Sequence, residues 1–435
     1  MASTILTRTV ASTGNNKILT WSGWVKRSDS STGQLIFANG DPGSSNYIIF
    51  FEFTGAGLRF IIKSLSILAN VETNAVFRDL SAYYHLVFNM DTTQATASNR
   101  IKMYVNGEQI TSFVTASYPS QNLGTQFNNA ASVISVGGKA VTGANTDFFN
   151  GYMSHVHFID GTVYGPSTFG ETDSLTGIWK PITSPSVTYG TNGFFLNFAN
   201  SGSMGTDSSG EGNNLAVTGT LTQTQDTPSN VYAVMNALDK VNVTLSNGNL
   251  NASCASSSGV RSTIAAADGK FYVEVKFQNT TSVCGVVAME QPVSTFNGIG
   301  AVLFGSSGSA PELFLNGTTP STYSSAGAFS ANDIMQIALD MDSNTVYFGK
   351  NGSWFGGTSW TESTPTTGHT LTSGYTYGVR GSTGSGTSVN IWNFGNGYFG
   401  TTAVASAGTN ASGIGIFEYD VPTGYTALST KGLNL

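Results

Sequence analysis

The chain has 435 residues, of which only 10% are charged, and its formal net charge is −7. This charge-poor, acidic composition excludes a duplex nucleic-acid binder, which needs a basic face to neutralise phosphates, and it excludes a coiled coil. Hydrophobic residues make up 40% of the chain, enough to bury a core, so the composition also excludes a disordered protein. The length predicts roughly two to three domains.

Short runs of alternating apolar and polar residues recur along the chain between clusters of Gly, Asn, Ser and Asp. This pattern is typical of β-sandwiches and barrels, and it predicts an all-β protein. In chain order, the run 101–105 ends at Asn106-Gly107, and the run 345–348 is soon followed by Asn351-Gly352. Asn-Gly favours a type I′ hairpin turn because both residues accept a positive φ. We therefore expect a β-hairpin at each of these two places.

Composition divides the chain into two domains and a connector. Residues 1–185 and 231–435 carry the strand-like runs, whereas 186–230 is rich in Gly, Ser, Thr and Asn, as a connector would be. The apolar run 193–198 inside this connector either completes the first domain or begins a separate small unit. A lone apolar strand needs a partner sheet, which favours the first alternative. The best candidate helix, 231–241, is short and interrupted by polar residues.

Blocks in the first region resemble, in order, the laminin-G-like (concanavalin A-like lectin) jelly roll. They are Trp21-Ser22-Gly23-Trp24-Val25, Tyr83-Tyr84-His85-Leu86-Val87, Tyr104-Val105-Asn106-Gly107 and Phe149-Asn150-Gly151-Tyr152. Tyr83 stands where that family has Trp. The resemblance implies an antiparallel β-sandwich over most of residues 1–165.

Blocks in the last region resemble a SPRY-type β-sandwich. They are Gly269-Lys270-Phe271-Tyr272-Val273-Glu274-Val275, Ala338-Leu339-Asp340-Met341-Asp342 and Tyr347-Phe348-Gly349-Lys350-Asn351-Gly352. The tandem of the two domains resembles virion proteins of tailed bacteriophages, in which a connector like residues 207–213 joins such sandwiches. The resemblance implies a place on the virion surface, other virion proteins as partners, and synthesis in the host cytoplasm. The N-terminus lacks a signal-peptide pattern, and no run is apolar enough for membrane insertion.

Pairs of carboxylates that could hydrolyse a glycosidic bond are scarce. Glycosidases that share the lectin-like jelly roll place alternate carboxylates on one strand, as nucleophile and acid. Glu171-Thr172-Asp173 begins such a pattern but continues without the further Glu, and Asp340-Met341-Asp342 belongs to the SPRY strand–turn pattern. We therefore expect a non-catalytic protein.

Two histidines are the first candidates for a metal site. His155 and His157 are two residues apart, so on a regular strand their rings would point the same way and could reach one ion. The alternative is that both are ordinary polar residues of a strand. Lectin-like sandwiches can also bind Ca²⁺ through oxygens at loop ends, for which Asp91, Asp207 and Asn213 are the candidates; no other cofactor is expected.

Aromatic residues near the second Asn-Gly turn are the candidates for glycan binding. They are Trp354, Trp360, Tyr375 and Tyr377. Exposed rings flanked by polar residues can stack on the apolar faces of sugars. The alternative for Trp354 is that it closes the sandwich core, as its place in the SPRY motif implies. Trp360, in a loop-like setting, is the stronger binding candidate.

Three functions are compatible with these features. The first is a fibre or adhesion component that binds host or environmental glycans, and the second is a capsid decoration or head-fibre protein that makes protein–protein contacts. The third, a glycan depolymerase, lacks a carboxylate motif. Parts of phage particles are symmetric, so we expect a homo-oligomer such as a trimer. Cys254 and Cys284 are either two buried thiols or a single disulfide, and buried thiols are the simpler interpretation.

Overall fold

The computed structural model describes residues 4–40, 47–174, 176–295, 298, 300–306, 311–318, 321–383 and 386–435. The chain forms two compact units, Met1–Gln223 and Thr224–Leu435. Within the described ranges the helical elements are short 3-10 turns, namely Ala97–Asn99, Pro166–Thr168, Ser324–Ala326 and Gly432–Asn434. None of these ranges holds a helix with the length and apolarity needed to cross a membrane. The predicted all-β class is confirmed.

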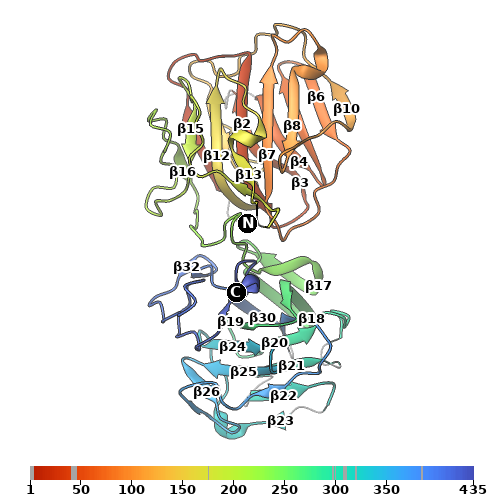
Figure 1. Ribbon diagram of the computed structural model, residues 1–435, viewed down its shortest axis with the longest axis vertical. Helices are drawn as coiled ribbons and strands as arrows, with labels where there is room; N and C mark the ends of the chain where they lie inside the picture. Colours follow the sequence, from red (N-terminus) through yellow and green to blue (C-terminus); the bar gives the residue numbers. More distant parts are fainter. Residues whose placement is uncertain are drawn as a thin grey trace. The chain divides into compact units, whose positions relative to one another are not determined.

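Two antiparallel sheets face each other in the first unit (Figure 1). The eight-stranded sheet has the order β10-β6-β5-β4-β3-β11-β1-β16, with the bounds β1 (Ile5–Thr9), β3 (Thr32–Gly40), β4 (Tyr47–Thr54), β5 (Gly57–Lys63), β6 (Ile67–Thr73), β10 (Phe113–Ser117), β11 (Val133–Val136) and β16 (Ala216–Thr218). The six-stranded sheet has the order β15-β12-β2-β7-β8-β9, with the bounds β2 (Ile18–Arg27), β7 (Tyr84–Asp91), β8 (Ile101–Val105), β9 (Glu108–Gln109), β12 (Gly151–Asp160) and β15 (Phe194–Leu196). A separate hairpin joins β13 (Gly170–Thr172) to β14 (Trp179–Pro181).

Aromatic rings fill the space between these two sheets. Phe51 of the eight-stranded sheet stacks on Phe88 of the six-stranded sheet at 4.3 Å between ring centroids. Trp21 packs against Phe88 at 5.8 Å and is completely buried. Side chains of a strand alternate between its two faces, so a strand such as β2 contributes to this core with part of its residues only.

The connector belongs to the first unit. Phe194 of β15 pairs with Phe158 of β12, at the edge of the six-stranded sheet. Val217 of β16 pairs with Leu6 of β1, at the edge of the eight-stranded sheet. The apolar run 193–198 therefore adds a strand to the first sandwich, because a sheet edge offers it both hydrogen bonds and an apolar face.

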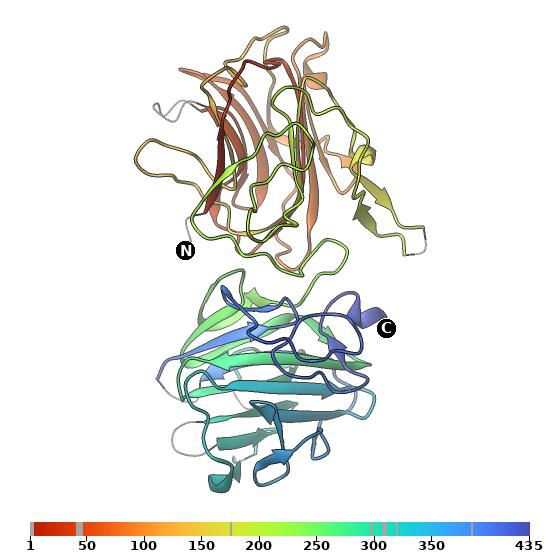
Figure 2. The ribbon, with the colours of Figure 1, turned by 90° about the vertical axis from the view of Figure 1, so that its left-hand side faces the viewer.

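The second unit is built around one long sheet that folds over itself (Figure 2). Its strands are β17 (Met235–Ser246), β18 (Asn251–Ala266), β19 (Lys270–Phe277), β20 (Ser282–Ala288), β21 (Ala301–Ser306), β22 (Pro311–Leu315), β23 (Ser321–Thr322), β24 (Ile334–Asp340), β25 (Thr345–Lys350), β26 (Ser353–Phe355), β27 (Trp360–Glu362), β28 (His369–Thr370), β29 (Tyr377–Thr383), β30 (Ser388–Asn393) and β33 (Thr426–Ala427). A small pair, β31 (Tyr398–Phe399) and β32 (Thr402–Ala403), accompanies it. Phe304 of β21 packs against Phe348 of β25 at 5.5 Å, so the two ends of the sheet face each other as two layers.

The hairpin β17–β18 runs through both layers. Residues Asn251 to Cys254 of β18 pair with β30, which continues into β19 and β24. From Val260 to Ala266 the same strand pairs with β29, which continues into β20 and β21. Strands that change sheets commonly do so through bulges or bends, and β18 changes partner within residues 255–259.

The local predictions have mixed outcomes. Both Asn-Gly turns are confirmed as hairpin turns with positive φ, 49° at Asn106 and 49° at Asn351. The candidate helix over 231–241 does not form, because from Met235 onward this segment is strand β17. Pairing with β18 supplies the hydrogen bonds that a short, polar-interrupted helix would have to supply by itself.

Candidate functional site

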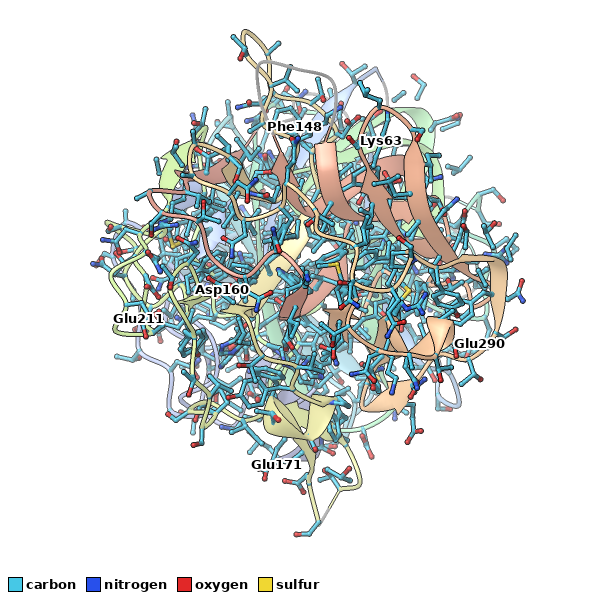
Figure 3. The ribbon with its side chains drawn as sticks, turned by 90° about the horizontal axis from the view of Figure 1, so that it is seen from above. Lys63, Phe148, Asp160, Glu171, Glu211 and Glu290 are labelled. Carbon is cyan, nitrogen blue, oxygen red and sulfur yellow. The ribbon has the colours of Figure 1, made fainter. Side chains whose placement is uncertain are left out.

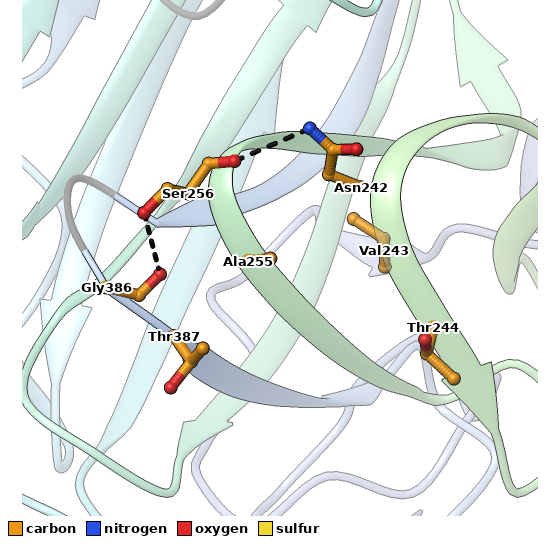
Figure 4. Close-up of a pocket in the computed structure, with 7 residues that line it drawn as sticks. All are labelled: Asn242, Val243, Thr244, Ala255, Ser256, Gly386 and Thr387. Atoms are coloured by element: carbon orange, nitrogen blue, oxygen red, sulfur yellow. Dashed lines mark hydrogen bonds between the residues drawn. The ribbon is translucent and has the colours of Figure 1, made fainter.

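A depression of about 700 Å³ lies where the hairpin β17–β18 bends (Figure 4). It is lined by Asn242, Val243, Thr244, Ala255, Ser256, Gly386 and Thr387; we call this the corner pocket. It exists because Val241 pairs with Gly259 while Val243 pairs with Cys254. Asn242 of β17 is thus opposed by the four residues 255–258 of β18, and this extra segment of β18 bulges away from β17.

Hydrogen bonds between the lining residues hold the pocket in shape. Asn242 has a φ of 52°, which Asn tolerates better than most residues. Its Nδ2 donates to the carbonyl oxygens of Ser256 and Ser257 at 3.5 and 3.4 Å. Ser256 Oγ donates to the carbonyl oxygen of Gly386 at 3.3 Å, which ties the bulge to the segment that leads into β30 (Figure 4).

The lining is polar but uncharged. Asn242, Thr244, Ser256 and Thr387 are all exposed, and they offer one amide and three hydroxyl groups, each able to donate and to accept hydrogen bonds. Among the described lining residues none is ionisable. Such a surface suits a neutral ligand rich in hydroxyl groups and offers no general acid or base.

Of the four predicted aromatic residues two are buried, so the exposed surface expected from the sequence is wrong for Trp354 and Tyr377. Trp354 is 3% exposed and Tyr377 is completely buried, so the alternative that Trp354 closes the core describes it correctly. Trp360 is half-buried among three phenylalanine rings, at 5.2 to 5.3 Å from Phe304, Phe329 and Phe355. Tyr375 is half-buried as well, and none of the four lines the corner pocket.

The two candidate metal-binding histidines have separate partners inside the first unit. The register of β12 shifts between Ser154 and His157, and His155 has a φ of 47°, so the regular alternation assumed from the sequence fails here. His157 is buried, stacks on Phe195 at 4.0 Å, and shares a hydrogen bond of 2.9 Å with the Tyr189 hydroxyl. Burial lowers the pKa of both rings. No group of three or more potential ligands surrounds a common point in the described ranges.

His85 is fixed in one neutral form by its neighbours. Trp179 Nε1 donates to His85 Nδ1 at 2.9 Å, so the proton of the ring lies on Nε2, which donates to Ser22 Oγ at 2.9 Å. Burial, reinforced by the charge of His155, lowers the pKa of His85 to about 3. In this arrangement His85 has no free nitrogen to take a proton from Ser22, so the pair does not act as a nucleophile and its base.

The candidate calcium ligands organise turns. Asp91 accepts hydrogen bonds from the backbone and hydroxyl of Thr93, at 3.0 and 2.6 Å. Asp207 accepts from the backbone nitrogens of Phe195 and Asn213, at 2.9 and 2.8 Å. Asn213 donates to two carbonyl oxygens and accepts from Arg8. Asp207 and Asn213 thereby anchor the connector, whereas Asp91 holds the turn that follows β7.

The paired carboxylates noted in the sequence are tied to lysines and backbone. Lys180 Nζ lies 3.5 Å from Glu171 Oε1 and 2.9 Å from Asp173 Oδ2. Glu171 stands on the hairpin β13–β14 (Figure 3). Asp340 forms a 2.8 Å ion pair with Lys270, and Asp342 accepts from the backbone nitrogen of Gly269 at 2.8 Å. Both pairs therefore serve strand and turn geometry, as the SPRY motif implies for the second.

Both cysteines are free and buried. Burial raises the pKa of Cys254 and of Cys284, so both are neutral thiols at neutral pH. The interpretation of two buried thiols is confirmed, and the alternative of a disulfide is wrong.

Comparison with known proteins places a lectin-like domain in the first unit. Residues 3–164 match the Laminin_G_3 family, described as the concanavalin A-like lectin/glucanases superfamily. No curated protein sequence matches the chain.

Solved structures similar to parts of the chain include SPRY domains. They are the TRIM65 PSpry domain (12% identity, covering 37% of this chain and 91% of that one, TM-score 0.30), the SPRY domain of human HERC1 (17%, 36% and 96%, TM-score 0.28) and a human SPRY domain (14%, 35% and 95%, TM-score 0.26).

Proposed function

We propose that this chain is a non-catalytic, glycan-binding component of the surface of a tailed-bacteriophage virion. The observation that carries the glycan-binding part is the corner pocket, whose described lining is made of amide, hydroxyl and small apolar groups. Ligand pockets commonly combine an apolar surface with a few placed polar groups. The virion location, synthesis in a host cytoplasm and a homo-oligomeric state rest on the resemblance of the tandem domains and on the symmetry of phage particles.

Two further observations favour binding over hydrolysis. The first unit matches a lectin-like family over residues 3–164, and this family includes binding proteins as well as glucanases. Glycoside hydrolysis needs two carboxyl groups about 5 to 9.5 Å apart across the bound sugar, and the corner pocket offers none among its described residues. A glycan depolymerase is therefore the least favoured function.

A purely structural role is the second candidate, and one surface feature favours it. Apolar side chains stand exposed around β6 and β10 at one edge of the eight-stranded sheet: Leu65 is 91% exposed, Ile67 58% and Val114 68%. Isolated exposed apolar residues are ordinary, but several near one sheet edge suit contact with another protein. A capsid decoration or head-fibre protein would use such a surface.

A glycan array with matched variants tests the proposal. Thr244→Trp places a bulky ring in the corner pocket, whereas Ser246→Trp places the same ring on the same strand outside its lining. We expect the wild type and Ser246→Trp to bind the same neutral glycans, and Thr244→Trp to lose this binding at least tenfold. Wild-type protein that binds no glycan would refute the function, whereas equal binding by all three proteins would refute the site.

Immunogold labelling of intact particles distinguishes a location on the tail fibres from a location on the head. Label on tail fibres favours adhesion, and label spread over the head favours decoration. A particle without label would contradict the virion location.

A further inference from the structure

Arg380 is a fully buried cation with unused hydrogen-bond donors. It lies on β29, directly between Arg261 of β18 and Gly285 of β20. Its side chain is 0% exposed. Nη2 donates one long hydrogen bond, 3.4 Å, to the carbonyl oxygen of Ser258, while Nε and Nη1 have no partner within the described part of the chain. A buried charge with unmade hydrogen bonds is strongly destabilising unless something compensates it.

The nearest carboxylate is already used by the neighbouring arginine. Arg261 Nε and Nη2 both lie 2.6 Å from Asp239 Oδ2. Arg261 Nη1 donates to the carbonyl oxygens of Met289 and Gln291 at 2.8 and 2.7 Å. Arg261 and Arg380 therefore stand opposite each other on adjacent strands, while Asp239 of β17 is ion-paired with Arg261. Like charges directly opposed on adjacent strands destabilise a sheet.

The other candidate for a counter-charge, Cys254, does not supply one. Burial raises the pKa of this thiol, so at neutral pH it carries no charge. Burial, with a contribution from Arg261, lowers the pKa of Arg380 to about 10, which still leaves the guanidinium charged at neutral pH. Asp239 also acts on Arg380 from a distance, but its carboxylate is ion-paired with Arg261, so it balances the charge on Arg380 only in part.

Gly259 and Ser258 of β18 lie next to the guanidinium of Arg380. A Cβ on Gly259 would collide with Arg380 Nη2, so the glycine makes room for the guanidinium. The Ser258 hydroxyl is also buried, and it lies beside the Cys254 thiol, which is only a weak acceptor. The unused groups of Arg380 are donors only, and the hydroxyl of Ser258 can donate too; such a set is complementary to an anion.

We propose that Arg380, with Ser258, holds a small monovalent anion of the size of chloride inside the second unit. The anion adds to the partial compensation by Asp239, whose carboxylate is ion-paired with Arg261, and it accepts the hydrogen bonds that Nε and Nη1 leave unmade. Because the unfolded chain offers no such cluster, binding is linked to folding: an anion at ten times its Kd raises the folding equilibrium constant about elevenfold.

Thermal unfolding of the full chain at constant ionic strength tests this, with sodium chloride replacing sodium gluconate. We expect the transition of the second unit to move upward with chloride in the wild type. Arg380→Met keeps the volume and removes the charge, so we expect that variant to be insensitive to the exchange of anions. Arg59→Met, which removes an ion-paired arginine of the first unit, is the control and should keep the wild-type response.

Anomalous diffraction from crystals grown in bromide gives a readout that does not need a variant. We expect a bromide peak within hydrogen-bonding distance of Arg380 Nε or Nη1. A water molecule in its place, or the same chloride response in wild type and Arg380→Met, would overturn the proposal.

Discussion

Glu274 gives the second unit a pH dependence opposite to ordinary acid denaturation. Its carboxylate is completely buried on β19. It accepts hydrogen bonds from the backbone nitrogens of Glu418 and Tyr419, at 2.9 and 2.8 Å, and from the side chains of Tyr272 and Asn393, at 3.0 and 3.3 Å. Burial outweighs these bonds and raises the pKa of Glu274 from 4.5 to about 7.

The sign of the effect follows from the two pKa values. The unfolded chain releases this proton near pH 4.5 and the folded unit only near pH 7, so rising pH favours the unfolded state over this window. The stabilisation by the protonated carboxyl is complete below pH 4.5 and lost by about pH 7. Each tenfold change in an equilibrium is worth about 1.4 kcal/mol, so the free energy of unfolding falls by about 3 kcal/mol across the window.

The variant Glu274→Gln isolates this contribution, because glutamine stays neutral and keeps the shape of the protonated side chain. His369, whose pKa burial lowers to about 4, acts in the opposite direction in both proteins and cancels from their difference. We expect the wild type to lose about 3 kcal/mol relative to Glu274→Gln between pH 4.5 and pH 8. Hydrogen exchange of peptides from β19, corrected for the intrinsic rate, measures this in the full chain.

Glu290→Gln, which changes an exposed carboxylate of the same unit, is the control and should follow the wild type. The reasoning about Glu274 is refuted if the wild type and Glu274→Gln show the same pH dependence. In that case the four hydrogen bonds would outweigh burial and keep the carboxylate ionised.

The remaining predictions concern His85 and Trp360. The pKa of His85 is lowered from 6.5 to about 3, so its neutral form stabilises the first unit above pH 6.5 and this stabilisation is lost as the pH falls towards 3. We expect the contribution of His85 to the free energy of unfolding to be about 2 kcal/mol smaller at pH 5 than above pH 6.5. Hydrogen exchange of β7 measures this loss of stability. The loss should be smaller in His85→Gln than in the wild type and unchanged in His369→Gln. We expect Trp360→Ala to lower the free energy of unfolding of the second unit by up to about 3 kcal/mol, which lowers its melting temperature. Glycan binding should stay at the wild-type level. A selective loss of glycan binding with unchanged stability would return Trp360 to the role expected from the sequence.

The sequence alone determined the features that depend on local backbone preference and on alternation. Asn106-Gly107 and Asn351-Gly352 form turns because Asn and Gly accept positive φ. Alternating apolar residues specify strands with one buried face, which is sufficient for an all-β chain. The ordered blocks around Trp21 and His85 identify the lectin-like part, and residues 3–164 match that family.

Only the tertiary structure decided which side chains are available to a ligand. The corner pocket depends on the change of partner of β18 from β30 to β29, which involves strands more than 100 residues away in the chain. The run Ser256-Ser257-Ser258-Gly259 was its one visible signal, and serine-rich stretches are common in this chain. A strand's pairing partners are set by long-range contacts, so spacing alone could not place this site.

The same physical reason explains why the aromatic and histidine residues have other surroundings than their spacing in the sequence suggests. A shift of register between Ser154 and His157 changes which face each residue occupies, and a bulge of this kind has no clear signature in the sequence. Trp360 lies in a polar segment that resembles a loop, yet the rings of Phe304, Phe329 and Phe355 enclose it. Residue type and spacing specify what a side chain can do, whereas packing between distant strands decides whether a ligand can reach it.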